Sequence, residues 1–197
     1  MDTKKNHSDI IEYEETAKEK HYHRGKSSEN LLDKQAILKG LNIQDGQTVL
    51  DAGCGNGYMA KEFAKITGES GKVYALDPDD ISIGILQTET KNTVIEAFTG
   101  DITQKTILLD SAIDLIYLST VVHGFSKEQM KGFTAEIDRI LKSNGKLAIL
   151  EINKKNTPFG PPIKLRFSPE ELVNEMKLNP IKTIKIGQYF YLQLFKK

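Results

Sequence analysis

Short apolar runs alternate with amphipathic stretches through the centre of this chain. The runs have the length of buried strands, and the stretches between them carry apolar residues at helical spacing. A chain that alternates strand and helix in this way folds into a parallel sheet with helices on both faces. The first predicted strand ends at Asp51, and the others cover residues 72–77, 93–101, 112–118 and 141–152, where a turn precedes the last strand.

Serine residues mark where several of the helices should begin. Ser126 and Ser168 each start a capping-box pattern, in which a Gln or Glu follows three residues later. The helix after Ser126 should run to about Leu141. Ser28 is expected to cap an earlier helix that ends at Gly40. The apolar stripe of that helix would consist of Leu31, Leu32, Ala36, Ile37 and Leu38.

The two ends of the chain differ from its centre. Residues 2–26 are polar and carry both signs of charge, with one helix expected between residues 8 and 20. Near the other end, residues 181–186 and 189–195 are apolar runs on either side of a Gly-Gln pair. That arrangement is typical of a hairpin.

The composition is that of an ordinary globular protein. Of the 197 residues, 39% are hydrophobic and 27% are charged, and the formal net charge is zero. A balanced charge gives no general attraction to nucleic acid or to a membrane, so neither partner is expected. The sequence shows no signal peptide and no apolar run that could span a membrane, so we expect a cytoplasmic protein. We expect it to be either a monomer or a homodimer. We expect one domain over residues 41–197, preceded by a helical segment over residues 1–40 that covers the substrate.

The segment that follows the first strand carries the clearest chemical signal. Gly53, Gly55 and Gly57 are spaced two apart after Asp51, and an amphipathic stretch follows them. Glycines at a strand-to-helix turn let bare backbone approach a ligand, because no Cβ stands in the way. A dinucleotide fingerprint, Gly-x-Gly-x-x-Gly, would place its third glycine at Tyr58, so that pattern is missed by one position. A nicotinamide oxidoreductase is therefore disfavoured.

The run Asp-x-Gly-x-Gly-x-Gly resembles the first motif of the class I S-adenosylmethionine-dependent methyltransferases. The order and spacing of the strands over residues 47–152 strengthen this resemblance. It implies a Rossmann-like, doubly wound α/β fold, in which a seven-stranded, mostly parallel sheet ends in an antiparallel C-terminal hairpin strand. It also implies S-adenosyl-L-methionine as the cofactor, with no metal ion.

The resemblance further implies which residues hold the methyl donor. Asp51 and the glycine turn would bind its methionine end, and Asp77, at the end of the second strand, its ribose hydroxyls. Asp101 would accept from the adenine amino group while Ile102 packs on the ring. Cys54 is interpreted as a small residue beside the ligand and not as a nucleophile. The complete expected set is Asp51, Gly53, Cys54, Gly55, Asn56, Gly57, Asp77, Pro78, Gly100, Asp101, Ile102, Ser119 and His123.

His123 is the candidate for a catalytic base. It follows the fourth strand in the run Val-Val-His-Gly-Phe, which resembles the Val-Leu-His-His-Val stretch of many small-molecule methyltransferases. Gly124 stands where that stretch has its second histidine. A base is needed only where the acceptor must lose a proton. The alternative, that His123 only shapes the donor pocket, stays open at this level.

Several side chains are candidates for contact with the acceptor. Tyr13, Tyr22 and Phe125 could offer aromatic faces to a sulfonium or an apolar group, although aromatic residues also serve in packing. Residues 153–167 form a proline-containing connection that is longer than most loops, and Arg166 within it could hold an anionic group. A solvated surface crossover is the competing interpretation of that connection.

Missing motifs narrow the acceptor class. No Asn/Asp-Pro-Pro-aromatic run, which base-amino methyltransferases carry, follows the fourth strand, and Cys54 is the single cysteine, whereas cytosine-C5 and arsenite enzymes need others. The resemblance then implies methyl transfer by in-line displacement to a small-molecule acceptor, as in the ubiquinone/menaquinone-type enzymes. Two alternatives remain. One is an RNA or protein methyltransferase that uses the basic face formed after residue 153, and the other is a protein that binds S-adenosylmethionine without catalysis.

Overall fold

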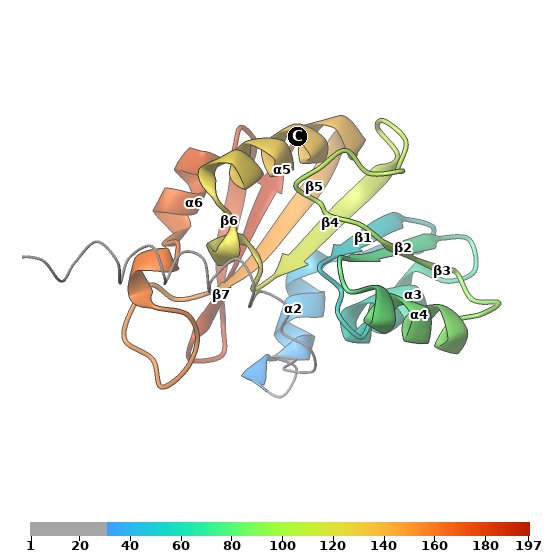
Figure 1. The fold of residues 1–197 in the computed structure, drawn as a ribbon, viewed down its shortest axis with the longest axis horizontal. Coiled ribbons are helices and arrows are strands. Elements are labelled where there is room, and N and C mark those ends of the chain that lie inside the picture. Colours follow the sequence, from blue (N-terminus) through green and yellow to red (C-terminus); the bar gives the residue numbers. More distant parts are fainter. Residues whose placement is uncertain (1–30) are drawn as a thin grey trace, which may run out of the picture.

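The computed structural model describes residues 31–197, which form one seven-stranded sheet with helices on both faces (Figure 1). The strands are β1 (Thr48–Ala52), β2 (Lys72–Asp77), β3 (Ile95–Thr99), β4 (Ile113–Ser119), β5 (Leu141–Ile152), β6 (Asn179–Ile186) and β7 (Phe190–Lys196). Their order in the sheet is β3-β2-β1-β4-β5-β7-β6. Strands β1 to β5 are parallel, and β7 runs antiparallel to both β5 and β6. The predicted doubly wound sheet with an antiparallel C-terminal hairpin is confirmed.

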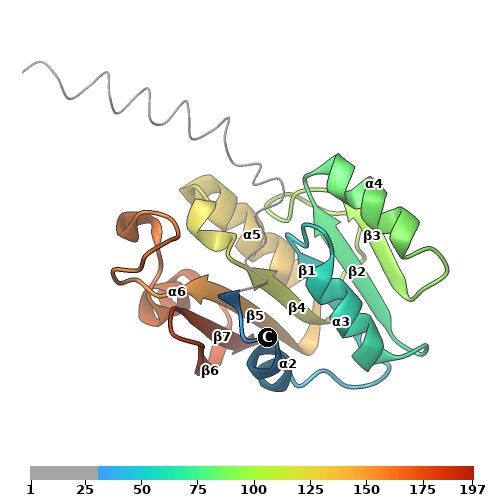
Figure 2. The same cartoon turned by 90° about the horizontal axis from the view of Figure 1, so that it is seen from below.

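The helices cover both faces of the sheet, so residues 31–197 form two hydrophobic cores (Figures 1 and 2). Successive residues of a strand point to opposite faces, and Val49 therefore belongs to one core and Leu50 to the other. The first core lies against α2 (Lys34–Leu41), α3 (Tyr58–Thr67) and α4 (Asp80–Glu89), and the second against α5 (Lys127–Ile140) and α6 (Pro169–Glu175).

The strand order reverses between β1 and β4. From β1 the chain builds outward to β2 and β3, and then crosses back to place β4 on the other side of β1. In doubly wound sheets, ligands bind at the carboxyl ends of the strands beside such a reversal. Asp51 and Tyr117 are paired across it, one on each strand.

The predicted capping boxes and the hairpin are present. The side chains of Ser126 and Ser168 each accept a hydrogen bond from the backbone N–H three residues later. Helix α5 ends at Ile140, within one residue of the expected end. Gly187, with φ +55°, lies in the turn that joins β6 to β7.

The start and end of α2 differ from the prediction. Ser28 lies outside the described residues, and the cap of α2 is Asp33, whose side chain accepts from the N–H of Ala36 at 3.0 Å. The prediction that Gly40 ends the helix was wrong, because α2 continues to Leu41. A Cβ on Gly40 would come within 2.8 Å of Ile184 on β6, so the glycine lets the helix pack closely on the hairpin.

The turn expected before the last parallel strand is a bulge within β5. The pairing of β5 with β4 shifts register between Ile113 and Leu115, and Asn144 has φ +69°. An irregularity of this kind bends a strand without ending it. The Ser-Asn-Gly run at residues 143–145 therefore predicted where the backbone turns, but not that the strand continues through the turn.

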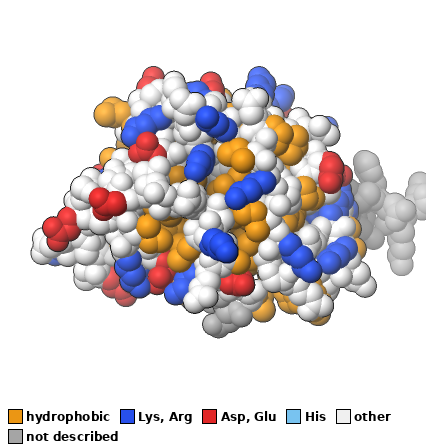
Figure 3. Space-filling model, turned by 180° about the vertical axis from the view of Figure 1, so that it is seen from behind, with side chains coloured by type: hydrophobic (Ala, Val, Ile, Leu, Met, Phe, Trp, Pro, Cys, Tyr) orange, Lys and Arg blue, Asp and Glu red, His pale blue; other side chains and the backbone are white. Residues whose placement is uncertain are grey.

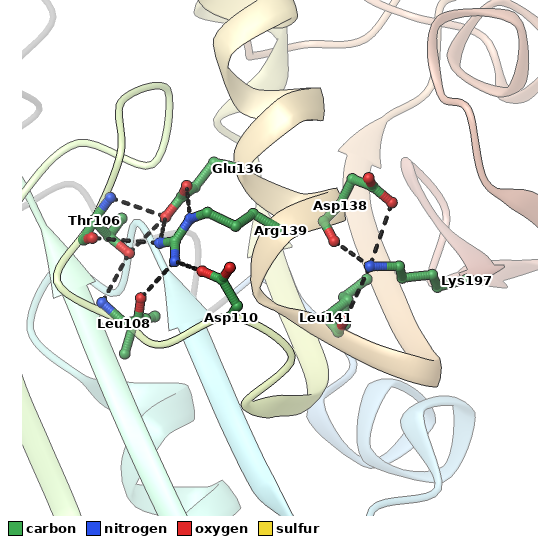
Figure 4. A network of polar contacts seen from close by, with 8 residues as sticks. All are labelled: Thr106, Leu108, Asp110, Glu136, Asp138, Arg139, Leu141 and Lys197. Carbon is green, nitrogen blue, oxygen red and sulfur yellow. Dashed lines mark hydrogen bonds and ion pairs between the residues drawn. The ribbon is translucent and has the colours of Figure 1, made fainter.

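A network of ion pairs fastens α5 to the loop before β4 (Figure 4). Glu136 is 4% exposed and accepts from the backbone N–H of Thr106 at 2.9 Å and from the Arg139 guanidinium at 2.6 Å. Arg139 also donates to the carbonyl of Leu108 at 2.8 Å and to Asp110 at 2.6 Å. The paired charges hold this loop against the helix, on the face of the sheet away from α3 and α4.

The surface mixes apolar and basic side chains. On the face behind the view of Figure 1, exposed hydrophobic side chains lie between Lys and Arg side chains (Figure 3). Ile107 and Leu109, in the loop between β3 and β4, are 73% and 76% exposed. Within residues 31–197, no helix is long and apolar enough to cross a membrane.

Candidate active site

The glycine turn lies at the carboxyl end of β1 and leads into α3. Gly53, Gly55 and Gly57 have φ values of +74°, +52° and +75°, in the left-handed region that other residues rarely adopt. The N–H groups of Gly53 and Cys54 both donate to the carbonyl of Leu76 on β2, at 2.7 and 3.0 Å. Nothing lies within 4 Å of the position that a Cβ on Gly55 would take. The turn therefore leaves open space over Gly55 that a ligand can fill.

Asp77 fastens this turn to the end of β2. One of its carboxylate oxygens accepts from the N–H of Gly55 at 2.8 Å, and the other accepts from the N–H of Asp79 at 2.9 Å. Asp77 is half-buried, and each carboxylate oxygen can accept a second hydrogen bond. The expected contact with a ribose stays a prediction, and the structure adds a role for Asp77 in shaping the glycine turn.

Asp51 is buried beneath the turn. It is 3% exposed, and its Oδ2 atom has no hydrogen-bond partner among the described residues. Burial raises the pKa of Asp51 to about 7; a backbone hydrogen bond from Ala60 opposes this shift, and the nearby Asp77 carboxylate adds to it. Burial also raises the pKa of the Cys54 thiol, which stays protonated at neutral pH. That state agrees with the interpretation of Cys54 as a small, unreactive residue.

The end of β3 reaches the same edge of the sheet. The N–H of Gly100 donates to the backbone carbonyl of Asp77 at 3.1 Å. Asp101 is exposed, and its side chain accepts from the N–H of Thr103 at 2.8 Å. Ile102 is 5% exposed and belongs to the core beneath α5. The adenine contacts expected of both residues stay predictions, as do those of Asn56 and Pro78, which are exposed at this edge.

His123 is held by a buried carboxylate. It lies in the 3₁₀ turn η2 (Val122–Gly124) that follows β4. Its ring Nδ1 is 2.9 Å from Oε2 of Glu151, and its backbone N–H donates to Oε1 at 3.4 Å. Glu151, on β5, is completely buried, while the His123 side chain keeps 16% of its exposure. A carboxylate at Nδ1 favours the tautomer with the proton on that atom, which leaves Nε2 able to accept a proton.

The segment that carries His123 packs against the glycine turn. A Cβ on Gly53 would come within 2.8 Å of the Val121 side chain, so the two segments touch. Thr120 has φ +55°, which is strained for a β-branched residue, and its N–H donates to the carbonyl of Leu150 at 2.8 Å. Backbone strain of this kind is concentrated at functional sites. Ser119, also expected to contact the donor, is the last residue of β4 and is half-buried.

Of the residues expected to contact an acceptor, only Phe125 and Arg166 lie in the described part of the chain. The Phe125 ring packs on that of Phe133 in α5, with 5.4 Å between the ring centres. Tyr13 and Tyr22 lie outside the described residues. Most of the segment expected to cover the substrate, residues 1–40, lies outside them too, and its described helix α2 packs against β6 and β7.

Arg166 is buried within the long connection between β5 and α6. It is 5% exposed, and its guanidinium donates to five acceptors at 2.7–3.1 Å. The structure therefore gives Arg166 a role in holding its own loop together, where the sequence had suggested an anionic substrate group. The five acceptors are the backbone carbonyls of Asn153, Lys155, Phe159 and Pro161 and the hydroxyl of Thr157.

Two residues of the site were missed by the sequence interpretation. Glu151 is an acid in the otherwise apolar run Leu-Ala-Ile-Leu-Glu-Ile, and that contrast was a signal that could have found it. Tyr117 gave no such signal, because tyrosine is common in strands. Its hydroxyl is buried and has no hydrogen-bond partner in the described part of the chain. The described residues hold no group of three or more His, Cys, Asp or Glu that could bind a metal ion.

Comparison with known proteins places this arrangement among methyltransferases. A family model described as a methyltransferase domain matches residues 49–145. The match includes the glycine turn, Asp77, Asp101 and His123. It ends inside β5, before Glu151.

Curated relatives match part of the chain. The ubiquinone/menaquinone biosynthesis C-methyltransferase UbiE of Paraburkholderia xenovorans is 32% identical over 121 residues, which cover 60% of this chain and 48% of that protein. An uncharacterized methyltransferase of Synechocystis is 26% identical over 136 residues, which cover 66% of this chain and 59% of the relative. The chain thus spans about half the length of the curated relatives it matches.

Solved structures share the whole fold. A SAM dependent methyltransferase from Aquifex aeolicus is 25% identical, with a TM-score of 0.76 over 92% of this chain and 97% of that one. The [4+2]-cyclase SpnF is 13% identical, with a TM-score of 0.68 over 83% of this chain and 79% of that one, a likeness of fold alone. Proteins with the same fold thus have different activities, and the reaction has to be argued from the residues of the site.

Proposed function

Because the chain belongs to the class I S-adenosylmethionine-dependent methyltransferases, we propose that it transfers a methyl group from this donor to a small-molecule acceptor. The observation that carries the proposal is the packing of two segments: the one that bears His123 lies against the glycine turn, through Val121 and Gly53. The relative from Paraburkholderia is named a C-methyltransferase of ubiquinone and menaquinone biosynthesis, which supports a small organic acceptor.

The residues at the carboxyl ends of β1 and β2 fit the donor. The open space over Gly55 has room for a ligand, and Asp51 has a buried carboxylate oxygen without a partner. Two carboxylates, Asp51 and Asp77, suit a ligand that carries an ammonium group and a sulfonium. When bound, the donor supplies an electrophilic methyl carbon. We assign its methionine end to the glycine turn, its ribose to Asp77 and its adenine to Asp101.

We assign His123 as the general base. With its Nδ1 proton directed at Glu151, the ring can accept a proton at Nε2 from a hydroxyl, amine or thiol of the acceptor. The buried Glu151 carboxylate would stabilise the imidazolium that forms. The other tasks of the site are to align the acceptor and to exclude water. A histidine held in this way supports an acceptor that loses a proton during the reaction.

Donor binding tests the first half of the proposal. Calorimetric titration with S-adenosylhomocysteine should give micromolar binding, and NADH should not bind. Asp77→Ala should weaken the binding by about 1.5–3 kcal/mol, because charge-assisted hydrogen bonds are lost. Asp80→Ala is the matched control, because Asp80 is an exposed carboxylate three residues later. Binding of NADH alone would overturn the proposal and restore the dinucleotide interpretation.

Acceptor screening tests the second half. Labelled donor is incubated with phenols, alcohols, thiols and amines, and with RNA and protein fractions for comparison. Label in the small molecules is the expected result, and His123→Gln should remove most of it. Label in RNA or protein alone would contradict the small-molecule proposal. Donor binding without transfer to any acceptor would favour a non-catalytic role.

Three cations of the C-terminal region are engaged within the fold, which weakens the RNA alternative. Lys154 pairs with Glu171 at 2.6 Å, and Lys197 lies 3.4 Å from Asp138. Arg166 is buried in its loop. Cations that are paired or buried within the fold contribute little to a surface that binds phosphates. For this reason we propose no second function.

A further inference from the structure

Tyr117 is a fully buried tyrosine whose hydroxyl has no hydrogen-bond partner in the described part of the chain. It lies on β4 directly opposite Asp51 on β1. Opposed residues of parallel strands point to the same face of the sheet, here the face covered by α3. The Oδ2 atom of Asp51 is also buried and unpartnered. Two unpartnered oxygens therefore share one face at the point where the strand order reverses.

The Tyr117 hydroxyl destabilises the folded protein. A buried hydroxyl without a partner destabilises a protein, because the hydrogen bonds that it makes to water in the unfolded chain are not replaced. The ring of Tyr117 makes an edge-to-face contact with Phe63 of α3, at 5.4 Å between ring centres, and phenylalanine would keep that contact. Stability alone thus favours phenylalanine at position 117. A use for the hydroxyl has to be sought in a second state of the site.

The hydroxyl is directed toward the ligand-binding edge of the sheet. Burial raises the pKa of Tyr117; a polar interaction of the hydroxyl with the Ser119 side chain opposes this shift, although its geometry is not that of a hydrogen bond, and the Asp51 carboxylate adds to the shift. Ser119 is two residues later on the same face and ends β4, so a hydroxyl beside it points to the carboxyl end of the strand. The hydroxyl is thus close enough to interact electrostatically with Asp51, at the edge of the sheet to which the donor is assigned.

The groups around Asp51 are neutral donors or another acid. Asp77 acts on it from β2, and the Cys54 thiol from the glycine turn; both Cys54 and Tyr117 have raised pKa values and stay protonated. Helix α3 contributes a backbone hydrogen bond from Ala60. An entering cation and a further hydrogen-bond donor would each favour the charged form of Asp51. Tyr117 is the donor without a partner of its own.

We propose that Tyr117 is a positioning residue that acts through Asp51 on the methionine end of the methyl donor, an inference that rests on the proposed function. Below about pH 7, where Asp51 holds a proton, entry of the ammonium group of the donor makes Asp51 release that proton to solvent. The Tyr117 hydroxyl then donates to Oδ2, directly or through one buried water. This hydrogen bond holds the carboxylate in its charged form, so donor binding is linked to proton release.

The test compares Tyr117→Phe with Tyr74→Phe. The control makes the same chemical change on β2, at a half-buried ring that packs edge-on against Phe98. Titration with S-adenosylhomocysteine between about pH 5 and pH 8, in two buffers of different ionisation enthalpy, gives the affinity and the number of protons released. Tyr117→Phe should bind about tenfold more weakly at pH 8, as expected for one lost hydrogen bond to a charged group. The difference should shrink toward pH 5, as a larger share of Asp51 stays protonated in the complex.

A measurement without ligand separates this role from a purely structural one. Donor-free Tyr117→Phe should unfold at a higher temperature than the wild type, because it lacks the unpartnered hydroxyl. Higher stability together with weaker, pH-dependent binding supports the proposal. Equal affinity of Tyr117→Phe and the wild type at pH 8 would overturn it while leaving the proposed function intact. Failure of the wild type to bind the ligand at any pH would overturn both.

Discussion

The Nδ1 atom of His123 lies 2.9 Å from a carboxylate oxygen of Glu151, although the two residues are 28 positions apart in the sequence. They meet because β4 and β5 are neighbours in the sheet and both end at the same edge. The carboxylate is completely buried, and the histidine ring keeps an exposed part. The contact with Glu151 orients the ring and fixes Nδ1 inside the protein. Nε2 is then the nitrogen that an acceptor can reach.

Glu151→Gln should lower turnover about a hundredfold, because an amide neither fixes the tautomer of His123 nor stabilises the imidazolium. The affinity for S-adenosylhomocysteine should stay within about twofold of the wild type, since one lost contact outside the donor site changes little. Glu175→Gln, at the exposed end of α6, is the matched control. The measurement is kcat against pH with an acceptor found in the screen. A variant with the wild-type pH profile would show that the pair is not used.

The glycine turn offers a pair of substitutions with opposite effects. A Cβ on Gly57 would come within 2.4 Å of Leu86 on α4, so Gly57→Ala should lower the free energy of unfolding by about 2–4 kcal/mol. Gly55 has open space, and Gly55→Ala should cost only about 1 kcal/mol for its positive φ.

Gly55→Ala should instead weaken binding of S-adenosylhomocysteine more than about tenfold, because the new methyl group would occupy space assigned to the ligand. Urea unfolding and calorimetry measure the two effects separately. Unchanged binding by Gly55→Ala would mean that the ligand does not lie over this glycine.

The raised pKa of Asp51 predicts how stability depends on pH. The ordinary value of 3.8 becomes about 7 in the folded protein. Between these values the folded protein holds a proton that the unfolded chain has released, so the free energy of unfolding falls as the pH rises from about 4 to about 7. The donor-free wild type should therefore lose about 2–4 kcal/mol more than Asp51→Asn between pH 4 and pH 8.

Urea unfolding curves at a series of pH values measure this difference. Other titrating groups are common to both proteins and cancel in the comparison. Parallel curves for the wild type and Asp51→Asn would show that Asp51 does not titrate as the buried site implies.

Arg166→Met should destabilise the protein by about 2–4 kcal/mol, since five acceptors in the loop lose their donor. Arg166→Lys should not restore it, because an ammonium group cannot serve acceptors placed around a planar guanidinium. Lys155→Met, at an exposed position of the same loop, should have little effect. Limited proteolysis of the loop is the readout. Cleavage of Arg166→Met no faster than that of Lys155→Met would contradict the role.

The order of elements followed from the sequence because each signal is local. An apolar run of strand length, a serine before a helix and a glycine after a strand each act within a few residues. The irregular places were harder. Gly40 looked like a helix end, but its small size serves a contact with Ile184 on a distant strand. The bulge in β5 depends on its register with β4, which no local pattern contains.

The features of the candidate site also fall into two groups, those that local sequence patterns predict and those that depend on contacts between distant residues. The sequence by itself determined the glycine turn and the acids at the ends of β1, β2 and β3, since a parallel sheet brings the ends of its strands to one edge. Only the tertiary structure decided which side chains meet there: Glu151 with His123, Tyr117 opposite Asp51, and Arg166 inside its own loop. The reason is physical, because these contacts depend on strand order, register and burial, and those are set by packing between residues far apart in the chain.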